Sequence, residues 1–279
     1  MTPPEPVLSR RRELGEASAR SLLMTLLGEF VLPREPGVWT SQLVTALAMF
    51  GVEEKSARQA LARTAAEGWL TARRQGRRAR WVLTAAGQRL LTAGADRIYS
   101  FGAGQPDWDR SWLVLVITVP VARRELRHRL RTRLAWAGFG SPSPGVWITP
   151  AAGREAEASQ ILSELGLAAA AMSFRASFGS IGAPESAAAQ AWDLAAVAAR
   201  YEEFIAAFAA LAPATGDEVL IAQTRLVHEW RRFPFLDPQL PAQLLPEQWS
   251  GTTAARLFHA RHAEWAPRAQ ARWDELAPA

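Results

Sequence analysis

The segment of residues 39–84 constrains the fold of this chain more than any other, because two helices and a basic hairpin account for nearly all of it. Leu43, Leu47 and Phe50 recur at helical spacing, and Gly51 follows at a position where a helix ends. A second helix is predicted to begin directly afterwards. The segment therefore predicts a helix, a tight turn and a second helix.

The second predicted helix begins near Glu53 and Glu54, whose negative charges stabilise the positive end of a helix. Ala57, Leu61 and Ala65 give it a narrow inner face of small and apolar side chains, which suits close packing. The outer face is polar and carries the side chains expected to reach DNA bases, namely Ser56, Arg58, Gln59 and Arg63.

Two alternating runs, WLTARR and ARWVLT, follow Gly68 and flank a turn that contains Gly76. Such runs around a glycine turn predict a β-hairpin. Five arginines of the hairpin are expected to contact DNA: Arg73, Arg74, Arg77, Arg78 and Arg80. Together with the two helices, the hairpin predicts a winged helix-turn-helix domain, in which the outer helix and the hairpin turn point to the same side.

The location of the charge supports the same interpretation. Residues 1–100 contain 15 Lys and Arg against 9 Asp and Glu, whereas residues 101–279 contain 17 against 18, so the excess of positive charge lies in the first third. Between Lys55 and Arg80 there are eight basic residues and one acid, Glu67. This density is typical of a surface that neutralises phosphates, and the alternative is a solvated basic face.

Composition excludes several classes of protein. With 279 residues, 49% of them hydrophobic, the chain can bury substantial cores, and we expect two or three domains. No apolar run approaches the ~20 residues of a membrane helix, and the N-terminus lacks the apolar run of a signal peptide. The absence of cysteine excludes disulfides, thiolate catalysis and cysteine-ligated zinc. We therefore expect a cytoplasmic protein without a membrane partner.

The fold class predicted from these patterns is α+β with several domains. The predicted order is a disordered N-terminal tail at 1–17, a winged-helix domain at 18–100, a linker at 101–109, a ferredoxin-like module at 110–180 and a helical C-terminal domain at 181–279. The tail is rich in proline and charge. An amphipathic helix at Ala19–Leu32 opens the second segment, and a short helix followed by a glycine-rich connection closes it.

The central segment predicts the order βαββαβ of a ferredoxin-like module. SWLVLVITV reads as a buried strand, and Pro120 as the start of an arginine-rich helix that runs to about Ala137. GFGSPSPGVWITP reads as two short strands. A helix at Glu155–Leu165 and a strand at Ala169–Phe174 complete the pattern.

The central segment resembles small CRISPR-associated nucleases of this fold, and a metal-dependent nuclease is therefore the alternative function. Those nucleases place an acidic metal ligand in the first strand. Here that strand carries no carboxylate, and Asp107 and Asp109 precede it. We therefore interpret the module as a scaffold or dimer contact.

The last segment predicts helices at Ser186–Leu211, Asp217–Arg232 and Thr252–Trp265. Between the last two lies FPFLDPQLPAQLLPEQWSG, whose prolines predict a stiff, non-helical segment with leucines that cover the helices.

The chain resembles the PaaX family of bacterial transcriptional repressors over nearly its whole length. The motifs that carry the resemblance are SARQAL and RRQGRRARWVLT, then WAGFGSPSPGVWITP, and above all RLVHEWRRFPFLDPQLPAQLLPEQWSG. The resemblance implies repression of catabolic genes, typically for phenylacetate degradation, relieved by an aryl-CoA thioester. It also implies dimeric operator binding, and a homodimer on an inverted repeat would double the length of DNA that one winged helix reads.

Cationic and aromatic side chains on the predicted helix at 217–232 suit an acyl-CoA, whose phosphates need arginine and whose ring needs an apolar wall. The candidate ligand residues are Trp192, Arg225, His228, Trp230 and Arg231. The alternative is a buried polar network that holds this helix against the proline-rich segment. The effector would be phenylacetyl-CoA or another acyl-CoA, and we expect no cofactor.

Enzymatic and metal-binding motifs give little support for catalysis. His259 and His262 are spaced three residues apart near Glu264, but two histidines make a weak metal site and an ordinary amphipathic helix explains them. The chain has no G-x-S-x-G, P-loop or dinucleotide motif. We therefore expect neither a catalytic residue nor a bound metal, and a protein that is not an enzyme.

Overall fold

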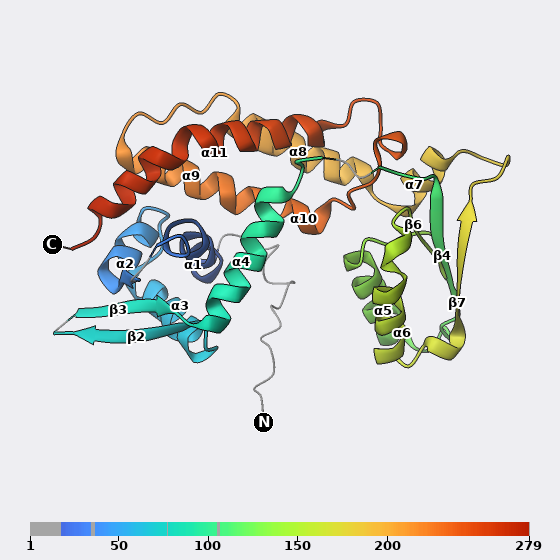
Figure 1. The fold of residues 1–279 in the computed structure, drawn as a ribbon, viewed down its shortest axis with the longest axis horizontal. Helices are drawn as coiled ribbons and strands as arrows, with labels where there is room; N and C mark the ends of the chain where they lie inside the picture. The colour runs from blue at the N-terminus through green and yellow to red at the C-terminus, as the bar shows by residue number, and fades with distance from the viewer. Residues whose placement is uncertain (1–17, 35–36, 77, 105–106, 279) are drawn as a thin grey trace. The chain divides into compact units, whose positions relative to one another are not determined.

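The helix that opens the fold, α1 (Ala19–Leu26), continues into a π-helical turn, η2 (Leu27–Val31). The computed structural model shown in Figure 1 describes residues 18–34, 37–76, 78–104 and 107–278. The apolar face predicted for this helix is buried, with Leu23, Leu26 and Phe30 fully enclosed. Ser18 caps the helix, since its hydroxyl accepts a hydrogen bond from the Ser21 amide at 3.2 Å. The predicted disordered tail at 1–17 lies outside the described residues.

The two predicted helices of the opening segment are α2 (Thr40–Ala48) and α3 (Glu54–Ala66). The predicted hairpin follows as β2 (Leu70–Gln75) and β3 (Arg78–Leu83). A two-residue strand that the sequence did not predict, β1 (Val38–Trp39), pairs with β3, so the sheet is antiparallel in the order β1-β3-β2.

Helix α4 (Ala85–Ser100) is longer than the short helix predicted after the hairpin. Thr84 caps it by accepting a hydrogen bond from the Gly87 amide at 3.0 Å. Gly87, in the first turn of α4, lies directly over the backbone of Trp69, where a Cβ would approach the Trp69 carbonyl oxygen to 2.2 Å. Close approach of the backbone therefore explains this glycine.

Two C-terminal helices belong to the same part of the structure as α1 to α4. Helix α9 (Gly216–Trp230) begins with a capping box in which Thr215 and Glu218 each bond the other's backbone amide. Helix α11 (Ser250–Glu275) passes through Pro267, and the predicted end near residue 265 is wrong. The cost of an interior proline is offset by packing beyond it, where Trp273 is buried and stacks on Phe30 at 4.8 Å between ring centroids.

The central sheet is formed by β4 (Ser111–Ile117), β5 (Gly140–Ser143), β6 (Val146–Thr149) and β7 (Ala171–Ser177). It is antiparallel, in the order β5-β6-β4-β7. Helices α5 (Arg124–Trp136) and α6 (Glu155–Glu164) connect the strands. Short 3-10 turns, η3 (Ala152–Arg154) and η4 (Ala168–Ala170), precede and follow α6.

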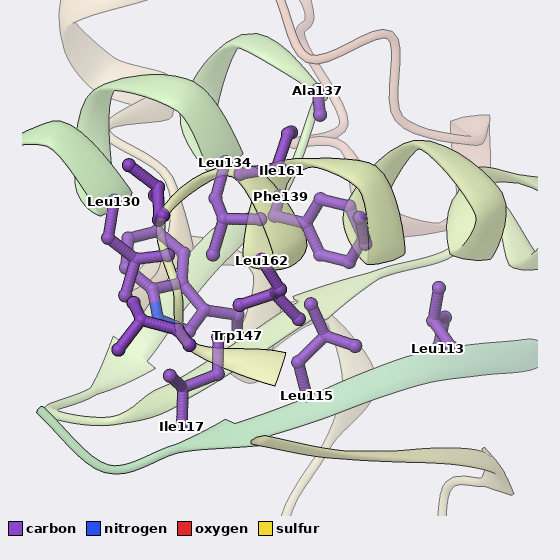
Figure 2. Close-up of a cluster of buried hydrophobic side chains, with 13 residues drawn as sticks. Leu113, Leu115, Ile117, Leu130, Leu134, Ala137, Phe139, Trp147, Ile161 and Leu162 are labelled. Atoms are coloured by element: carbon purple, nitrogen blue, oxygen red, sulfur yellow. The ribbon is translucent and has the colours of Figure 1, made fainter. Parts of the chain in front are cut away.

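One face of this sheet carries the larger core, which Figure 2 shows in close-up. Every second residue of β4, namely Leu113, Leu115 and Ile117, points to this face. These side chains pack with Leu130 and Leu134 of α5. The helix α5 begins at Arg124, four residues after the predicted start at Pro120, because residues 121–123 form a turn that precedes it.

The other face of the sheet packs on α7 (Pro184–Ala191), the start of α8 (Leu194–Phe208) and the proline-rich segment. The single helix predicted at 186–211 is wrong, because Trp192 is extended and divides it. Asp193 then caps α8 by accepting a hydrogen bond from the Ala196 amide at 3.0 Å. The proline-rich segment contains α10 (Phe233–Leu236) and η5 (Ala242–Leu244), so the prediction that it is non-helical is also wrong.

The chain divides into two compact units. The first unit consists of Met1–Phe101, Phe204–Phe233 and Ala254–Ala279, and the second of Gly102–Glu203 and Pro234–Thr253. Residues predicted as a separate helical domain at 181–279 are therefore shared between the two units. The predicted boundaries of the functional domains stay a prediction.

Candidate nucleic-acid interface

Helix α3 separates its two faces as the sequence predicts. Ala57, Ala60, Leu61 and Thr64 are buried, and α3 contacts α1 and α2. The four candidate base-reading residues of this helix, Ser56, Arg58, Gln59 and Arg63, are all exposed. The outer face of α3 is therefore free to meet a ligand over its whole length.

Arg58 pairs with Glu54 one helical turn earlier, with 2.7 Å between Nε and the carboxylate oxygen. Both side chains are more than half exposed. An exposed pair of this spacing stabilises a helix by only a few tenths of a kcal/mol, about 0.3–0.5. The pair positions Arg58, and breaking it costs little free energy. Arg58 can therefore exchange Glu54 for a phosphate or a base.

The hairpin places three of its arginines on one face. In the register of β2 and β3, Arg73 lies opposite Arg80 and Gln75 opposite Arg78, whereas Arg74 lies opposite Ala79 and points to the other face. Like charges directly opposite each other destabilise a sheet. An anion on this face would relieve that repulsion. The fifth candidate, Arg77, lies outside the described residues.

Arg80 also has a structural role that the sequence did not reveal. Its guanidinium lies 5.2 Å from the ring centroid of Trp39, and its Nε donates to the Gly37 carbonyl at 3.4 Å. Thr40 then ties the start of α2 to the hairpin, because its hydroxyl donates to the Ala79 carbonyl at 3.1 Å and accepts from the Trp81 indole at 2.9 Å. The hairpin is therefore held against the start of α2.

Glu67, the one acid of the basic segment, is paired with Arg20 of α1. Both guanidinium Nη atoms of Arg20 donate to the two oxygens of Glu67, one of them at 2.6 Å, and the Arg20 guanidinium lies 5.3 Å from the Trp69 ring centroid. Arg20 is a residue that sequence reasoning missed. Because Glu67 is paired with Arg20, the segment from Lys55 to Arg80 carries no unpaired acid.

The candidate ligand residues of α9 are mostly part of the first unit's interior. His228 and Trp230 are buried, and Arg225 is exposed. The Trp230 indole donates to the Ile98 carbonyl at 3.1 Å, and its ring stacks on Phe258 at 4.6 Å between centroids. A buried ring whose N–H donates to a backbone carbonyl is typical of a core tryptophan, so Trp230 is a core residue.

His228 and Arg231 both contact α1. The Nδ1 atom of His228 lies 3.0 Å from the Thr25 hydroxyl, and Arg231 donates to the Ser21 hydroxyl at 2.5 Å. Burial, together with the positive charges of Arg231 and Arg232, lowers the pKa of His228 to about 3. The imidazole is therefore neutral at physiological pH and holds α9 to α1.

Trp192 belongs to the second unit, whereas the other four candidate ligand residues belong to the first. Its ring covers Gly140, where a Cβ would approach the indole to 2.5 Å. Trp192 therefore completes the packing of α7 on β5. The assignment of these five residues to an effector stays a prediction.

His262 of α11 has a structural partner as well. The Nε2 atom of His262 lies 3.0 Å from the Glu29 carboxylate, and Glu264 pairs with Arg261 at 2.8 Å. Among the described residues, no group of three or more His, Asp or Glu side chains could hold a metal ion.

The strand β4 has the sequence SWLVLVI, and the nearest carboxylate, Asp109, caps its start by accepting from the Ser111 amide at 2.8 Å. In the described part of the chain, no helix is both long and apolar enough to cross a membrane.

Three family patterns match consecutive parts of the chain. They are described as "PaaX-like protein" at residues 18–87, "PaaX protein central Cas2-like domain" at 105–188 and "PaaX-like protein C-terminal domain" at 192–275. The Transcriptional repressor PaaX of Escherichia coli is 32% identical over 265 residues, which cover 91% of this chain and 82% of that protein.

A solved structure, "Uncharacterized protein Rv0674 from Mycobacterium tuberculosis", aligns with a TM-score of 0.64. The alignment covers 93% of this chain and 98% of the other at 23% sequence identity, so this likeness concerns the fold. The match to all three family patterns in order, and to a repressor over nine-tenths of the chain, shows that this protein is a member of the PaaX family.

Proposed function

We propose that the protein is a DNA-binding transcriptional repressor that acts in the cytoplasm, and that α2, α3 and the hairpin β2–β3 form its winged helix-turn-helix. The observation that carries this proposal is the distribution of charge: α3 and one hairpin face expose arginines, and Glu67, the one acid between Lys55 and Arg80, is paired with Arg20. Membership of the PaaX family and the similarity to a transcriptional repressor support it.

In this proposal α3 enters the major groove and the hairpin lies along the adjacent backbone. Ser56, Arg58, Gln59 and Arg63 reach base edges, where arginine discriminates through paired hydrogen bonds. Arg73 and Arg78 contact phosphates, which position the protein without reading sequence. Arg80, held against Trp39, keeps the wing in place for those contacts.

The second unit supplies a ferredoxin-like scaffold rather than a catalytic site. Numbered within the unit, the strand order β5-β6-β4-β7 is 2-3-1-4, the order of a βαββαβ module. The protein is proposed to bind an inverted repeat as a homodimer, because a single winged helix reads too few bases for genomic specificity. Light scattering at micromolar concentration should give twice the 30.5 kDa chain mass, and a monomer both free and on DNA would contradict it.

An acyl-CoA such as phenylacetyl-CoA is proposed as the effector that releases the operator, as membership of the PaaX family suggests. The protein must have one arrangement that binds DNA and one that does not. A ligand releases DNA only if its affinity for the second arrangement is higher than its affinity for the first. The experiment is therefore an operator footprint upstream of the protein's own gene, repeated with a panel of CoA thioesters.

The docking of α3 is tested by Arg58→Ala. We expect the operator affinity to fall by about 1–3 kcal/mol, and the affinity for random DNA to fall less. Arg89→Ala on α4 is the matched control, because Arg89 is an exposed arginine of the same unit outside α3 and the hairpin. Equal operator affinities of wild type and Arg58→Ala at physiological salt would reject the docking.

A further inference from the structure

The second unit contains a groove that the DNA-binding proposal does not use. It lies between the first half of α5, the end of β4 and the turn that joins β5 to β6, and its volume is about 710 Å³. This volume is within the roughly 300–1,000 Å³ of pockets that hold small organic ligands. The side chains that decide its chemistry are Ile117, Val121, Arg127, His128, Arg131 and Trp147.

One wall of the groove is cationic. Arg127, His128 and Arg131 come from consecutive turns of α5, and none of the residues that line the groove is acidic. The Nη2 atom of Arg127 donates to the Val121 carbonyl at 2.8 Å, which holds the loop at the groove rim. Glu125 of α5 does not line the groove, and Glu164 of α6 is paired with Arg133.

Arg131 and the His128 imidazole are exposed, and among the described residues neither side chain makes a hydrogen bond or an ion pair. The groove therefore holds two donor side chains, one of them the charged Arg131 guanidinium, without a protein counter-ion. An anionic group placed between them would gain charge-assisted hydrogen bonds.

The floor of the groove is apolar. Ile117, Leu130 and Trp147 line it and also belong to the buried core drawn in Figure 2. At the rim, Val121 exposes 78% of its surface, so a hydrophobic side chain stands in water beside the cationic wall. A nucleic-acid backbone would use the charges but not this floor, whereas an organic anion would use both.

We propose that this groove binds an organic anion with a flat apolar body, its carboxylate or phosphate on His128 and Arg131 and its apolar part against Val121 and Trp147. The proposal rests on the proposed function, because it names where an effector-responsive repressor would take its effector. Free aryl carboxylates and acyl-CoA thioesters share this chemistry, and the experiment below separates them.

The test is calorimetry on the full chain with phenylacetyl-CoA, CoA, phenylacetate and inorganic phosphate as separate probes. We expect one of the two aromatic probes to bind, and the CoA and phosphate arms to bind at least tenfold more weakly. Binding of phenylacetyl-CoA alone assigns the phosphates to the cationic wall, and binding of phenylacetate assigns the carboxylate.

The double variant His128→Gln/Arg131→Gln should bind the probe at least tenfold more weakly than wild type. Arg129→Gln is the matched control, since Arg129 is an exposed arginine of the same helix that does not line the groove, and it should stay within twofold of wild type. Val121→Glu gives an independent variant at an exposed position, and a carboxylate there should repel the anion and weaken binding to a similar degree.

Operator affinity without ligand is measured for every variant and should equal that of wild type. Wild-type affinity for the probe in both groove variants, a loss in Arg225→Ala instead, or no binding of any probe would overturn the groove proposal. A wild-type protein that binds no operator would overturn the proposed function itself, so the two failures are distinguishable.

Discussion

The Nδ1 atom of His228 lies 3.0 Å from the hydroxyl oxygen of Thr25, although 203 positions separate the two residues in sequence. This contact joins α9 to α1 inside the first unit, and the bond from Arg231 to Ser21 repeats it one helical turn away. The C-terminal family pattern therefore contributes helices to the same unit as the N-terminal one. The C-terminal part of the chain therefore anchors α1, which in turn packs on α3.

The stability of the protein should depend on the protonation of His228. Burial lowers the pKa of His228 to about 3, from an ordinary value near 6.5. Between these two pH values the imidazole is therefore protonated in the unfolded chain and neutral in the folded protein. The free energy of unfolding is unaffected by this residue above pH ~6.5 and falls as pH drops toward ~3. Between about pH 7.5 and about pH 5 the loss should be about 2 kcal/mol.

The measurement is urea unfolding of wild type and His228→Gln across that pH range. The glutamine variant keeps a hydrogen-bonding side chain but cannot titrate, so its stability should lose about 2 kcal/mol less than that of wild type. Parallel curves for the two proteins would show that His228 is protonated as easily in the folded state as in the unfolded one.

Glu29 should contribute strongly to the stability of the first unit. Burial would raise the pKa of Glu29, but hydrogen bonds and the charge of His262 lower it below the usual range. Its carboxylate accepts from the Gln223 amide at 2.7 Å and from the Tyr99 hydroxyl. Glu29→Gln removes the charge and places an amide NH2 group opposite the donors of Gln223 and Tyr99. The free energy of unfolding should therefore fall by about 2–4 kcal/mol.

Glu67→Gln is the control for this buried carboxylate. Glu67 also pairs with a cation of the same unit, but its side chain is 36% exposed, so the loss should be less than about 1 kcal/mol. Equal losses in the two variants, measured by urea unfolding, would contradict the role assigned to burial.

Arg73 should contribute to DNA affinity through phosphate contact and add nothing to stability. Arg73→Ala removes a like-charge repulsion with Arg80, so the free energy of unfolding should not decrease. Operator and random DNA should both bind more weakly. The slope of log affinity against log salt should fall by about 0.9, as expected for one lost phosphate contact. An unchanged slope, with Arg89→Ala measured in parallel, would place Arg73 away from the DNA backbone.

Gly140 should be intolerant of any side chain. A Cβ on Gly140 would lie 2.5 Å from the Trp192 indole and 2.7 Å from the Ala191 methyl group. Gly140→Ala should therefore lower the free energy of unfolding by about 1–3 kcal/mol. Gly153→Ala is the control in the same unit, since a Cβ there has no atom within 4 Å, and it should change stability by less than about 0.5 kcal/mol. A thermally unaffected Gly140→Ala protein would mean that Trp192 moves freely.

Much of the secondary structure could be predicted because its signals are local. The spacing of Leu43 and Leu47, the turn at Gly51 and the alternation around Gly76 predict α2, α3 and the hairpin, and each of these elements forms. The apolar run of β4 behaves in the same way. The motifs near Arg231 were sufficient to predict the family.

Other elements depend on partners far away in the chain. The strand β1 has only two residues and exists because it pairs with β3, and α11 continues through Pro267 because Trp273 packs on Phe30. The helix predicted at 186–211 breaks because Trp192 packs over Gly140.

The two candidate ligand regions show the same division. The sequence by itself placed cationic and aromatic side chains on α9, but only the tertiary structure decided that Trp230 fills the core and that His228 bonds Thr25. It also brought Arg131 of α5 beside Trp147 of β6 in one groove, a pairing with no signal in either segment alone. Periodicity along the chain encodes which face of a helix or strand is apolar, whereas the partner of that face is decided by shape and charge complementarity between segments distant in sequence.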